Sequence, residues 1–285
     1  MEKFETIPAV RSYLKRERSR GKSIGLVPTM GALHRGHMEL IRRSKEHTDL
    51  TAVSLFVNPI QFNSPEDLEN YPRDLHRDLT LLSQEAVDLV FIPNETEMYP
   101  EAVITEFDFG PMEQVLEGQF RPGHFNGVGI VVSKLFHIIQ PDMAFFGQKD
   151  LQQVTLIRRL VRDLSFPTTV VTVPTVRETN GLALSSRNLR LSEQGRDTAS
   201  LLHQTLLFCQ AELMKGGDWL FIKSQAMDRL LRTASIEPEY LELVELNRFS
   251  VMSSPVSGLP HALCIAAFVE NIRLIDNIVI SEEQN

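Results

Sequence analysis

The 285-residue sequence predicts an α/β protein, with a doubly wound parallel sheet first and a smaller α+β part after it. Up to about residue 173, β-branched apolar runs such as residues 51–57 alternate with amphipathic segments, which is typical of parallel strands joined by helices. Beyond residue 174 this alternation stops, and two helical stretches precede three strand-like runs. We therefore expect one domain over residues 1–175 and a second over residues 176–285.

Periodicity, caps and breakers predict the individual elements. In the first domain we expect a helix capped by Thr6 and ended by Gly21, a helix start with Ser64 as its cap, and further helices at residues 38–47, 73–85, 128–139 and 151–164. Strands are expected at residues 23–27, 51–57, 88–93, 143–146 and 168–173, with an edge strand at 105–109. In the second domain we expect helices at 192–215 and 218–233 and strands at 239–246, 262–269 and 273–280.

Composition excludes several classes of function. No apolar run approaches the ~20 residues that span a bilayer, and no apolar signal region follows Met1, so we expect a cytoplasmic protein without a membrane partner. Two cysteines are too few for a disulfide framework or a zinc cage. The net charge of −8 is unfavourable for nucleic acid, and an anionic ligand would need a locally positive pocket.

Residues 28–37, Pro-Thr-Met-Gly-Ala-Leu-His-Arg-Gly-His, join the first long strand to the next helix. Small residues let the backbone approach a ligand closely, and a helix N-terminus offers N–H groups and a positive dipole end that favour phosphate. His34 and His37 lie at the same helix start, where a cation is disfavoured unless an anion joins it. Two ordinary surface or helix-end histidines are the plainer interpretation, and a metal site lacks a third ligand nearby.

Two more loops after predicted strands carry groups suited to phosphate. Ligands of doubly wound sheets bind at the carboxyl ends of the strands. Lys149 can reach a phosphate as a point charge and Asp150 can accept from ribose hydroxyls, although an ordinary turn with a solvated ion pair has the same residues. The hydroxyls and guanidinium of residues 185–187 can close over phosphate oxygens, or this stretch is a helix-capping linker.

Uncharged amides form a third group of candidates. Asn58, Gln61 and Gln153 suit a small hydroxylated or carboxylate ligand that has to be oriented, although each alone can be structural. They would complement the candidate phosphate-binding loops if such a ligand binds beside them.

Taken together, five motifs in order resemble the pantothenate synthetase (pantoate–β-alanine ligase) family. They are PTMGALHRGH at 28–37, FVNPIQF at 56–62, RPGHF at 121–125, FGQKDLQQ at 146–153 and LALSSRN at 182–188. The resemblance covers about residues 1–190, and LIDN at 274–277 is its clearest part beyond them. The family commonly has Glu where Gln148 stands.

The resemblance implies a Rossmann-like fold of the nucleotidylyltransferase branch, which shares its His-x-Gly-His loop with class I aminoacyl-tRNA synthetases. It implies an AMP-forming ligase, in which ATP and (R)-pantoate give pantoyl adenylate and pyrophosphate, and the amine of β-alanine then displaces AMP to give pantothenate. It also implies Mg²⁺ with ATP, no tightly bound organic cofactor, a C-terminal domain that acts as a lid, and a homodimer.

Roles carry over to matching positions. His37, His34 and Lys149 are the implied catalytic residues. ATP binding is implied for Met30, Gly31, Ala32, Leu33, His34, Arg35, Gly36, His37, Gly147, Gln148, Lys149, Asp150, Val176, Leu184, Ser185, Ser186 and Arg187. Pantoate binding is implied for Met30, Gln61 and Gln153, and β-alanine binding for Gln61 and Asn58. No protein ligand for a metal is evident, and Asp78 is the one candidate for the metal environment.

Two alternatives remain open at this point. A nucleotidylyltransferase that keeps the nucleotide in its product would share the His-x-Gly-His loop but need no amine acceptor. A regulatory module would bind ATP without releasing pyrophosphate. A tRNA synthetase is disfavoured, because no anticodon-reading region fits and the chain is acidic.

Overall fold

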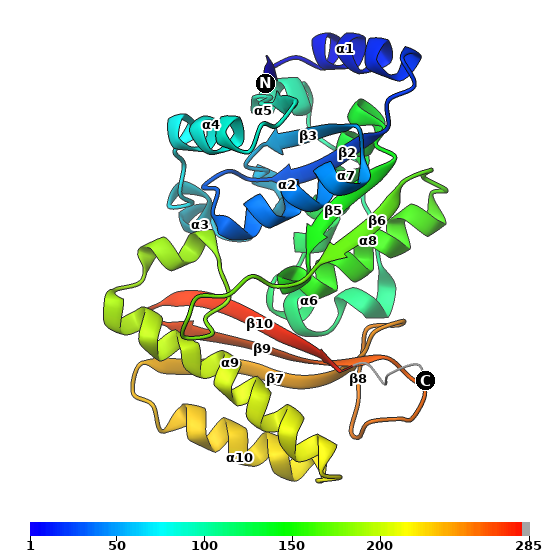
Figure 1. Cartoon of the computed structure of the whole chain (residues 1–285). Coiled ribbons are helices and arrows are strands. Elements are labelled where there is room, and N and C mark those ends of the chain that lie inside the picture. The colour runs from blue at the N-terminus through cyan, green and yellow to red at the C-terminus, as the bar shows by residue number, and fades with distance from the viewer. Residues whose placement is uncertain (281–285) are drawn as a thin grey trace. The chain divides into compact units, whose positions relative to one another are not determined.

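A computed structural model of the chain describes residues 1–280, which form two compact units (Figure 1). The first unit consists of Met1–Phe109, Arg121–Gln148 and Leu156–Pro174. The second unit consists of Gly110–Phe120, Lys149–Thr155 and residues 175–280. Two short segments that precede residue 175 in the chain therefore make most of their contacts with the second unit.

The first unit is built on a six-stranded parallel sheet in the order β1–β4–β3–β2–β5–β6. The strands are β1 (Glu2–Phe4), β2 (Ile24–Thr29), β3 (Leu50–Leu55), β4 (Leu89–Phe91), β5 (Met143–Gly147) and β6 (Thr169–Val173). Every residue of β3 is buried, as the continuous apolar run predicts for a strand covered on both faces. The predicted doubly wound parallel sheet is confirmed.

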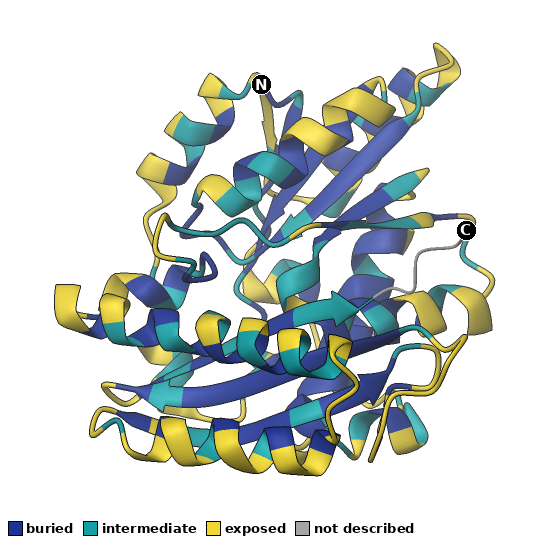
Figure 2. Ribbon diagram, turned by 60° about the horizontal axis from the view of Figure 1, so that its bottom comes forward, coloured by how far each residue is buried: buried dark blue, intermediate teal, exposed yellow. Residues whose placement is uncertain are grey.

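Helices cover this sheet. They are α1 (Ile7–Ser19), α2 (Arg35–His47), α3 (Pro65–Glu69), α4 (Leu75–Gln84), α5 (Glu95–Met98), α7 (His124–Ile139) and α8 (Leu151–Asp163), of which α8 is shared between the two units. Val27, Val53 and Val90 are in register on neighbouring strands, and they form one core cluster with Ile41 of α2 and Leu82 of α4. The inner strands β2, β3, β4 and β5 are buried along most of their length, and buried residues are dark blue in Figure 2.

Two expectations for the first unit were wrong. Residues 105–109 form no strand, and the sheet edge is formed instead by β1, which pairs with β4 through Glu2 and Leu89. Thr6 occupies the N-cap of α1, but its side chain makes no capping hydrogen bond. Glu97 replaces it, because its Oε1 accepts from Ile7 N at 2.7 Å. A contact between residues so far apart in the chain leaves no local sequence signal.

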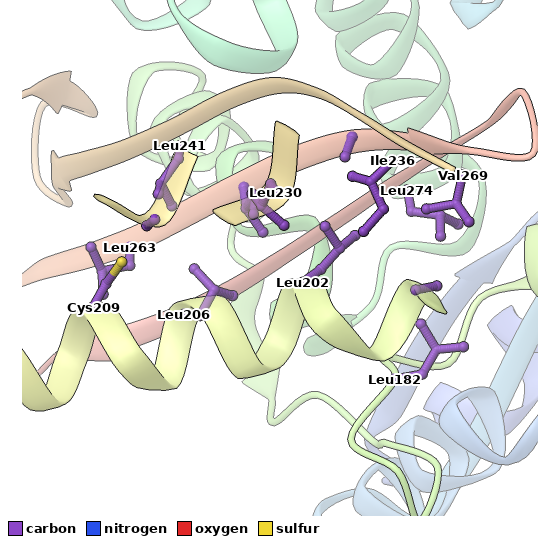
Figure 3. Packing of buried hydrophobic residues seen from close by; sticks show 14 of the residues in the cluster. Leu182, Leu202, Leu206, Cys209, Leu230, Ile236, Leu241, Leu263, Val269 and Leu274 are labelled. Carbon is purple, nitrogen blue, oxygen red and sulfur yellow. The ribbon is translucent and has the colours of Figure 1, made fainter. Parts of the chain in front are cut away.

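The second unit contains a four-stranded antiparallel sheet in the order β10–β9–β7–β8. Its strands are β7 (Ile236–Glu245), β8 (Ser250–Val251), β9 (His261–Val269) and β10 (Ile272–Ile280), and its helices include α6 (Leu116–Phe120), α9 (Glu193–Met214) and α10 (Trp219–Leu231). Leu202 and Leu206 of α9 pack on Leu263 and Leu274 of the sheet (Figure 3). The predicted α+β architecture is confirmed, but the short helix α6 and the short strand β8 were not foreseen.

A buried network explains why Gly110–Phe120 belongs to the second unit. Both carboxylate oxygens of Glu117 accept from the Arg273 guanidinium, at 2.7 and 2.8 Å, and the Tyr240 hydroxyl donates to the same carboxylate at 2.8 Å. Gln152 also holds the segment, because its Nε2 donates to Met112 O and its Oε1 accepts from Glu117 N.

Within residues 1–280, none of the helices is both long and apolar enough to cross a membrane.

Candidate active site

The first unit has a topological switch point between β2 and β5. These strands are neighbours, with Gly25 opposite Met143, but the chain leaves β2 towards β3 and leaves β5 towards β6, in opposite directions. Helices that diverge in this way leave a crevice outside the carboxyl ends of the two strands, where ligands of doubly wound sheets bind. Residues 30–34 follow β2 at this edge, and Gln148 follows β5.

The loop after β2 is held in an unusual backbone conformation. Gly31 and Ala32 have φ of 82° and 49°, in the left-handed region, which Gly tolerates freely and Ala does not. The buried carboxylate of Asp78 on α4 compensates for this strain, since it accepts from Ala32 N at 2.9 Å and Leu33 N at 2.7 Å. A Cβ added to Gly31 would lie 2.9 Å from Asp78 Oδ2, so the glycine also makes room for this carboxylate.

His34 and His37 cap the N-terminus of α2 reciprocally. His34 Nδ1 accepts from Gly36 N at 3.1 Å, and His37 Nδ1 accepts from His34 N at 3.2 Å. Their ring centroids are 4.0 Å apart. A nitrogen that accepts carries no proton, so we assign the neutral tautomer with the proton on Nε2 to both rings. Two imidazoles can therefore occupy a helix N-terminus without placing cations there, and each can donate from Nε2.

A second group lies in the turn after β3, the 3₁₀ helix η1 (Pro59–Gln61). Asn58 is buried, and its Nδ2 donates to Gly127 O of α7 at 3.0 Å and to Gln61 Oε1 at 3.1 Å. Gln61 Nε2 is 3.2 Å from Met30 Sδ, which brings the predicted pantoate-binding residues Met30 and Gln61 together. His124 of the RPGHF motif supports this turn, because its Nδ1 is 2.8 Å from Gln61 O.

The second unit holds the remaining predicted residues. Lys149 Nζ is 3.6 Å from Asp150 Oδ1, and the Lys149 carbonyl accepts from Asn277 Nδ2 of β10 at 2.9 Å. Gln153 is partly buried near the start of α8. Nothing in the sequence indicated that Asn277, the last residue of the LIDN motif, would hold the lysine segment.

A hairpin-like turn carries the other candidates of the second unit. Leu184 N donates to Val176 O at 3.0 Å, and Ser185 caps a 3₁₀ turn by accepting from Arg187 N at 3.3 Å, while Ser186 is buried. Arg177 anchors the turn on β10, because its guanidinium donates to both oxygens of Asp276, at 2.6 and 2.9 Å. Both loops of this unit are therefore fixed by two adjacent residues of one strand.

A protein-held metal is not evident in the part of the chain that the structure describes. Residues 1–280 contain no group of three or more His, Cys, Asp or Glu side chains placed to hold a metal ion. Asp78, the candidate for the metal environment, has both carboxylate oxygens engaged by the loop after β2.

These features define an α/β protein of the Rossmann-like class, with two histidines in the loop that follows β2 at its switch point. Residues 2–279 match the model of the pantoate-beta-alanine ligase family. The chain is 44% identical over 276 residues to pantothenate synthetase from Cytophaga hutchinsonii, with 96% of this chain and 98% of that protein covered. It is 46% identical over 283 residues to the Moorella thermoacetica enzyme of the same name, with 98% and 99% covered.

Solved structures agree with this relation. Pantothenate synthetase from Thermus thermophilus superposes with a TM-score of 0.90 at 42% identity, covering 98% of this chain and 99% of that one. The Francisella tularensis pantoate-beta-alanine ligase, complexed with beta-gamma ATP and beta-alanine, has a TM-score of 0.80 at 32% identity, covering 98% and 97%. The chain belongs to the pantoate–β-alanine ligase family. The expectation of a ligase of this family is confirmed.

Proposed function

We propose that the chain condenses (R)-pantoate with β-alanine in two steps. The pantoate carboxylate attacks the α-phosphorus of ATP, which forms pantoyl adenylate and releases pyrophosphate. The β-alanine amine then attacks the acyl carbon, and AMP leaves with the carboxylate oxygen that pantoate contributed. The observation that carries this proposal is the reciprocal cap at α2, which holds two imidazole rings, each with its proton assigned to Nε2, in the loop after β2.

Charge neutralisation is the main requirement of the first step, because a carboxylate approaches a polyanion. We assign phosphate contacts to His34 and His37 in the first unit and to Lys149 in the second, together with residues 185–187. Preorganised donors of this kind are worth about 3 kcal/mol each in the barrier. Asp150 accepts from the ribose, the Val176 backbone contacts adenine, and residues 30–37, 147–148 and 184 complete the ATP contacts. Mg²⁺ enters with ATP as part of the substrate.

The amides orient the acid and the amine. We propose that Met30, Gln61 and Gln153 hold pantoate, and that Gln61, with Asn58 behind it, borders β-alanine. Pantoyl adenylate hydrolyses easily, so the site has to exclude water. We propose that the second unit acts as a lid for this purpose. We also propose that the enzyme works in the cytoplasm as a homodimer, as the family resemblance implies.

Pantoate-dependent exchange of labelled pyrophosphate into ATP tests the proposal, because it requires the nucleotide, the acid and the intermediate together. Without β-alanine, exchange should depend on pantoate and little free AMP should accumulate. Addition of β-alanine should release AMP and pantothenate in equal amounts. Exchange that proceeds without pantoate, or pantothenate formation without AMP, would overturn the proposed reaction course.

A further inference from the structure

Tyr99, at the C-terminal end of α5, makes a contact that the reaction scheme does not use. Its hydroxyl donates to Asn58 Oδ1 at 2.8 Å. The centroid of its ring lies 5.9 Å from that of Phe56 and 5.4 Å from Lys134 Nζ. Burial raises the pKa of the Tyr99 hydroxyl well above its usual value, so it stays protonated and can donate. The hydrogen bond joins this tyrosine to the turn that carries Gln61.

The polarity of this contact follows from a backbone group. The Gly127 carbonyl can only accept, so the end of the Asn58 amide that faces it, at 3.0 Å, has to be the nitrogen. Asn58 Oδ1 consequently faces Tyr99 and accepts from its hydroxyl. The amide orientation of Asn58 is thus fixed from two sides, by an acceptor and by a donor.

The orientation of the Asn58 amide in turn fixes that of the Gln61 amide. The second N–H of Asn58 Nδ2 donates to Gln61 Oε1 at 3.1 Å, and a flipped Gln61 amide would place two N–H donors against each other. Gln61 therefore directs its Nε2 away from Asn58, towards Met30 Sδ at 3.2 Å. Sulfur is a weak acceptor, so a substrate oxygen would be the stronger partner for this amide nitrogen.

We propose that Tyr99 is a positioning residue for pantoate recognition, which acts through Asn58 to hold the amide nitrogen of Gln61 towards the substrate. A substrate then has to present a hydrogen-bond acceptor to the Gln61 amide nitrogen, such as a carboxylate oxygen or a hydroxyl lone pair. This inference rests on the proposed contact between Gln61 and pantoate. Tyr99 itself does not touch the substrate.

A double-mutant cycle tests the inference, because the effects of substitutions at two coupled residues are not additive. Y99F keeps the ring but removes the hydroxyl, and it should raise the pantoate KM about three- to tenfold, the value of one hydrogen bond, with the ATP KM unchanged. In a Q61A background, the same substitution should have no further effect on the pantoate KM. Y13F, which removes a hydroxyl elsewhere in the first unit, serves as the matched control and should leave both constants unchanged.

The other outcomes show which part of the inference fails. If Y99F leaves the pantoate KM unchanged, or raises it by the same factor with and without Gln61, Tyr99 does not act through this amide. If Q61A itself leaves the pantoate KM unchanged while exchange still requires pantoate, the assigned contact fails but the proposed reaction stands. Loss of pantoate dependence in the wild-type protein would instead overturn the proposed function.

A second substitution tests the polarity itself. Q61E keeps the shape but presents an oxygen where the amide nitrogen stands, so it should raise the pantoate KM more than Q61A does. Lowering the pH should partly reverse this effect, because protonation of the introduced carboxyl restores a donor. A Q61E variant with a wild-type pantoate KM would show that no donor is needed at this position.

Discussion

The carboxylate of Asp78 on α4 accepts a hydrogen bond from Leu33 N at 2.7 Å, across 45 positions of the chain. With the second bond from Ala32 N, it holds the left-handed turn that places His34 at the start of α2. A charged acceptor is well suited to this task, because hydrogen bonds to ionised groups are worth about 1.5–3 kcal/mol, against about 1 kcal/mol for neutral pairs. The geometry of the histidine loop therefore depends on a residue outside it.

The substitution Asp78→Asn should lower kcat/KM for ATP about tenfold or more. The amide has nearly the same volume, but one of its ends is an NH₂ group that faces a backbone N–H, so the loop has to shift. Steady-state kinetics with varied ATP and saturating pantoate measure the effect. Asp163→Asn, which removes one partner of an exposed ion pair, is the matched control and should change kcat/KM little. An unaltered kcat/KM for ATP in Asp78→Asn would refute the positioning role.

Asp78 should also make the enzyme acid-sensitive. Burial raises the pKa of this carboxyl above its ordinary value of 3.8, more than the two backbone N–H groups lower it. As the pH falls through the raised pKa, the protonated carboxyl loses acceptor capacity and kcat/KM for ATP should fall. Wild type should therefore show an acid limb that Asp78→Asn lacks, in profiles measured between about pH 4 and 7. Coincident profiles would exclude Asp78 as the titrating group.

The contribution of Asp78 to the stability of the fold should depend on pH in the opposite direction to its effect on kcat/KM. The folded state binds the Asp78 proton more tightly than the unfolded chain does, so the contribution of this group to the free energy of unfolding is greatest below pH 3.8. It falls as the pH rises through the folded-state pKa. Denaturation of wild type and Asp78→Asn over the same pH range should show this difference in slope, with Asp163→Asn following wild type.

The sheet could be predicted from the sequence because its signals are local. The run at residues 51–57 has the length and composition of a strand buried on both faces, and β3 occupies Leu50–Leu55. The edge strand could not be predicted, because Glu2–Phe4 is only three residues long and is defined by its pairing with β4. Residues 105–109 have strand-like composition but find no strand partner among the described residues.

For the candidate site, the sequence motifs indicate which groups we expect to meet a substrate, such as His34 and Gln61, because these lie in short segments with distinctive residue types. Their contacts with a substrate stay a prediction. The supporting roles of Asp78 and Tyr99 were not identified, since both act through hydrogen bonds to positions more than 40 residues away. The sequence analysis named Asp78 only as a candidate for the metal environment, and it did not name Tyr99. In sequence, the Asp78 carboxylate and the partly buried Tyr99 hydroxyl look like those of ordinary residues in or beside a helix.

His37 should prove to combine a structural and a chemical role, which two substitutions separate. His37→Ala removes both the cap and the Nε2 donor, so turnover should fall about 100-fold and stability by about 1 kcal/mol. His37→Asn can keep the cap, because the asparagine Oδ1 can accept from His34 N as the histidine Nδ1 does. It lacks a donor at the position of Nε2. Turnover should fall equally in the two variants, while the melting temperature falls only in His37→Ala. Near-normal pantothenate formation by His37→Asn would limit His37 to capping.

Lys149→Ala should weaken the use of ATP more than that of pantoate. The substitution removes the ammonium but leaves the carbonyl that accepts from Asn277 Nδ2, so the loop keeps its anchor. The KM for ATP should rise several-fold, and separate titrations of the two substrates measure the difference. Lys215→Ala, at an exposed helix end, is the control for loss of one positive charge. Equal increases in both KM values would indicate a general disturbance of the loop.

Gly127→Ala tests how closely α7 supports the Gln61 turn. Alanine normally stabilises a helix interior by about 1 kcal/mol relative to glycine, but a Cβ here would lie 2.5 Å from Ile60 O and 2.7 Å from Gln61 N. These are backbone atoms that cannot rotate away, so the turn has to move. We expect a loss of about 1–3 kcal/mol in the free energy of unfolding and a higher pantoate KM.

The same helix provides a control for this substitution. A Cβ at Gly129 would meet the ring of Phe107 at 2.9 Å, and a side chain can shift where a backbone cannot. Gly129→Ala should therefore cost less stability and leave the pantoate KM unchanged. Chemical denaturation and pantoate titrations of the two variants measure both effects. If Gly127→Ala stabilised the protein, as helix propensity alone predicts, the close contact between α7 and the turn would not constrain Gln61.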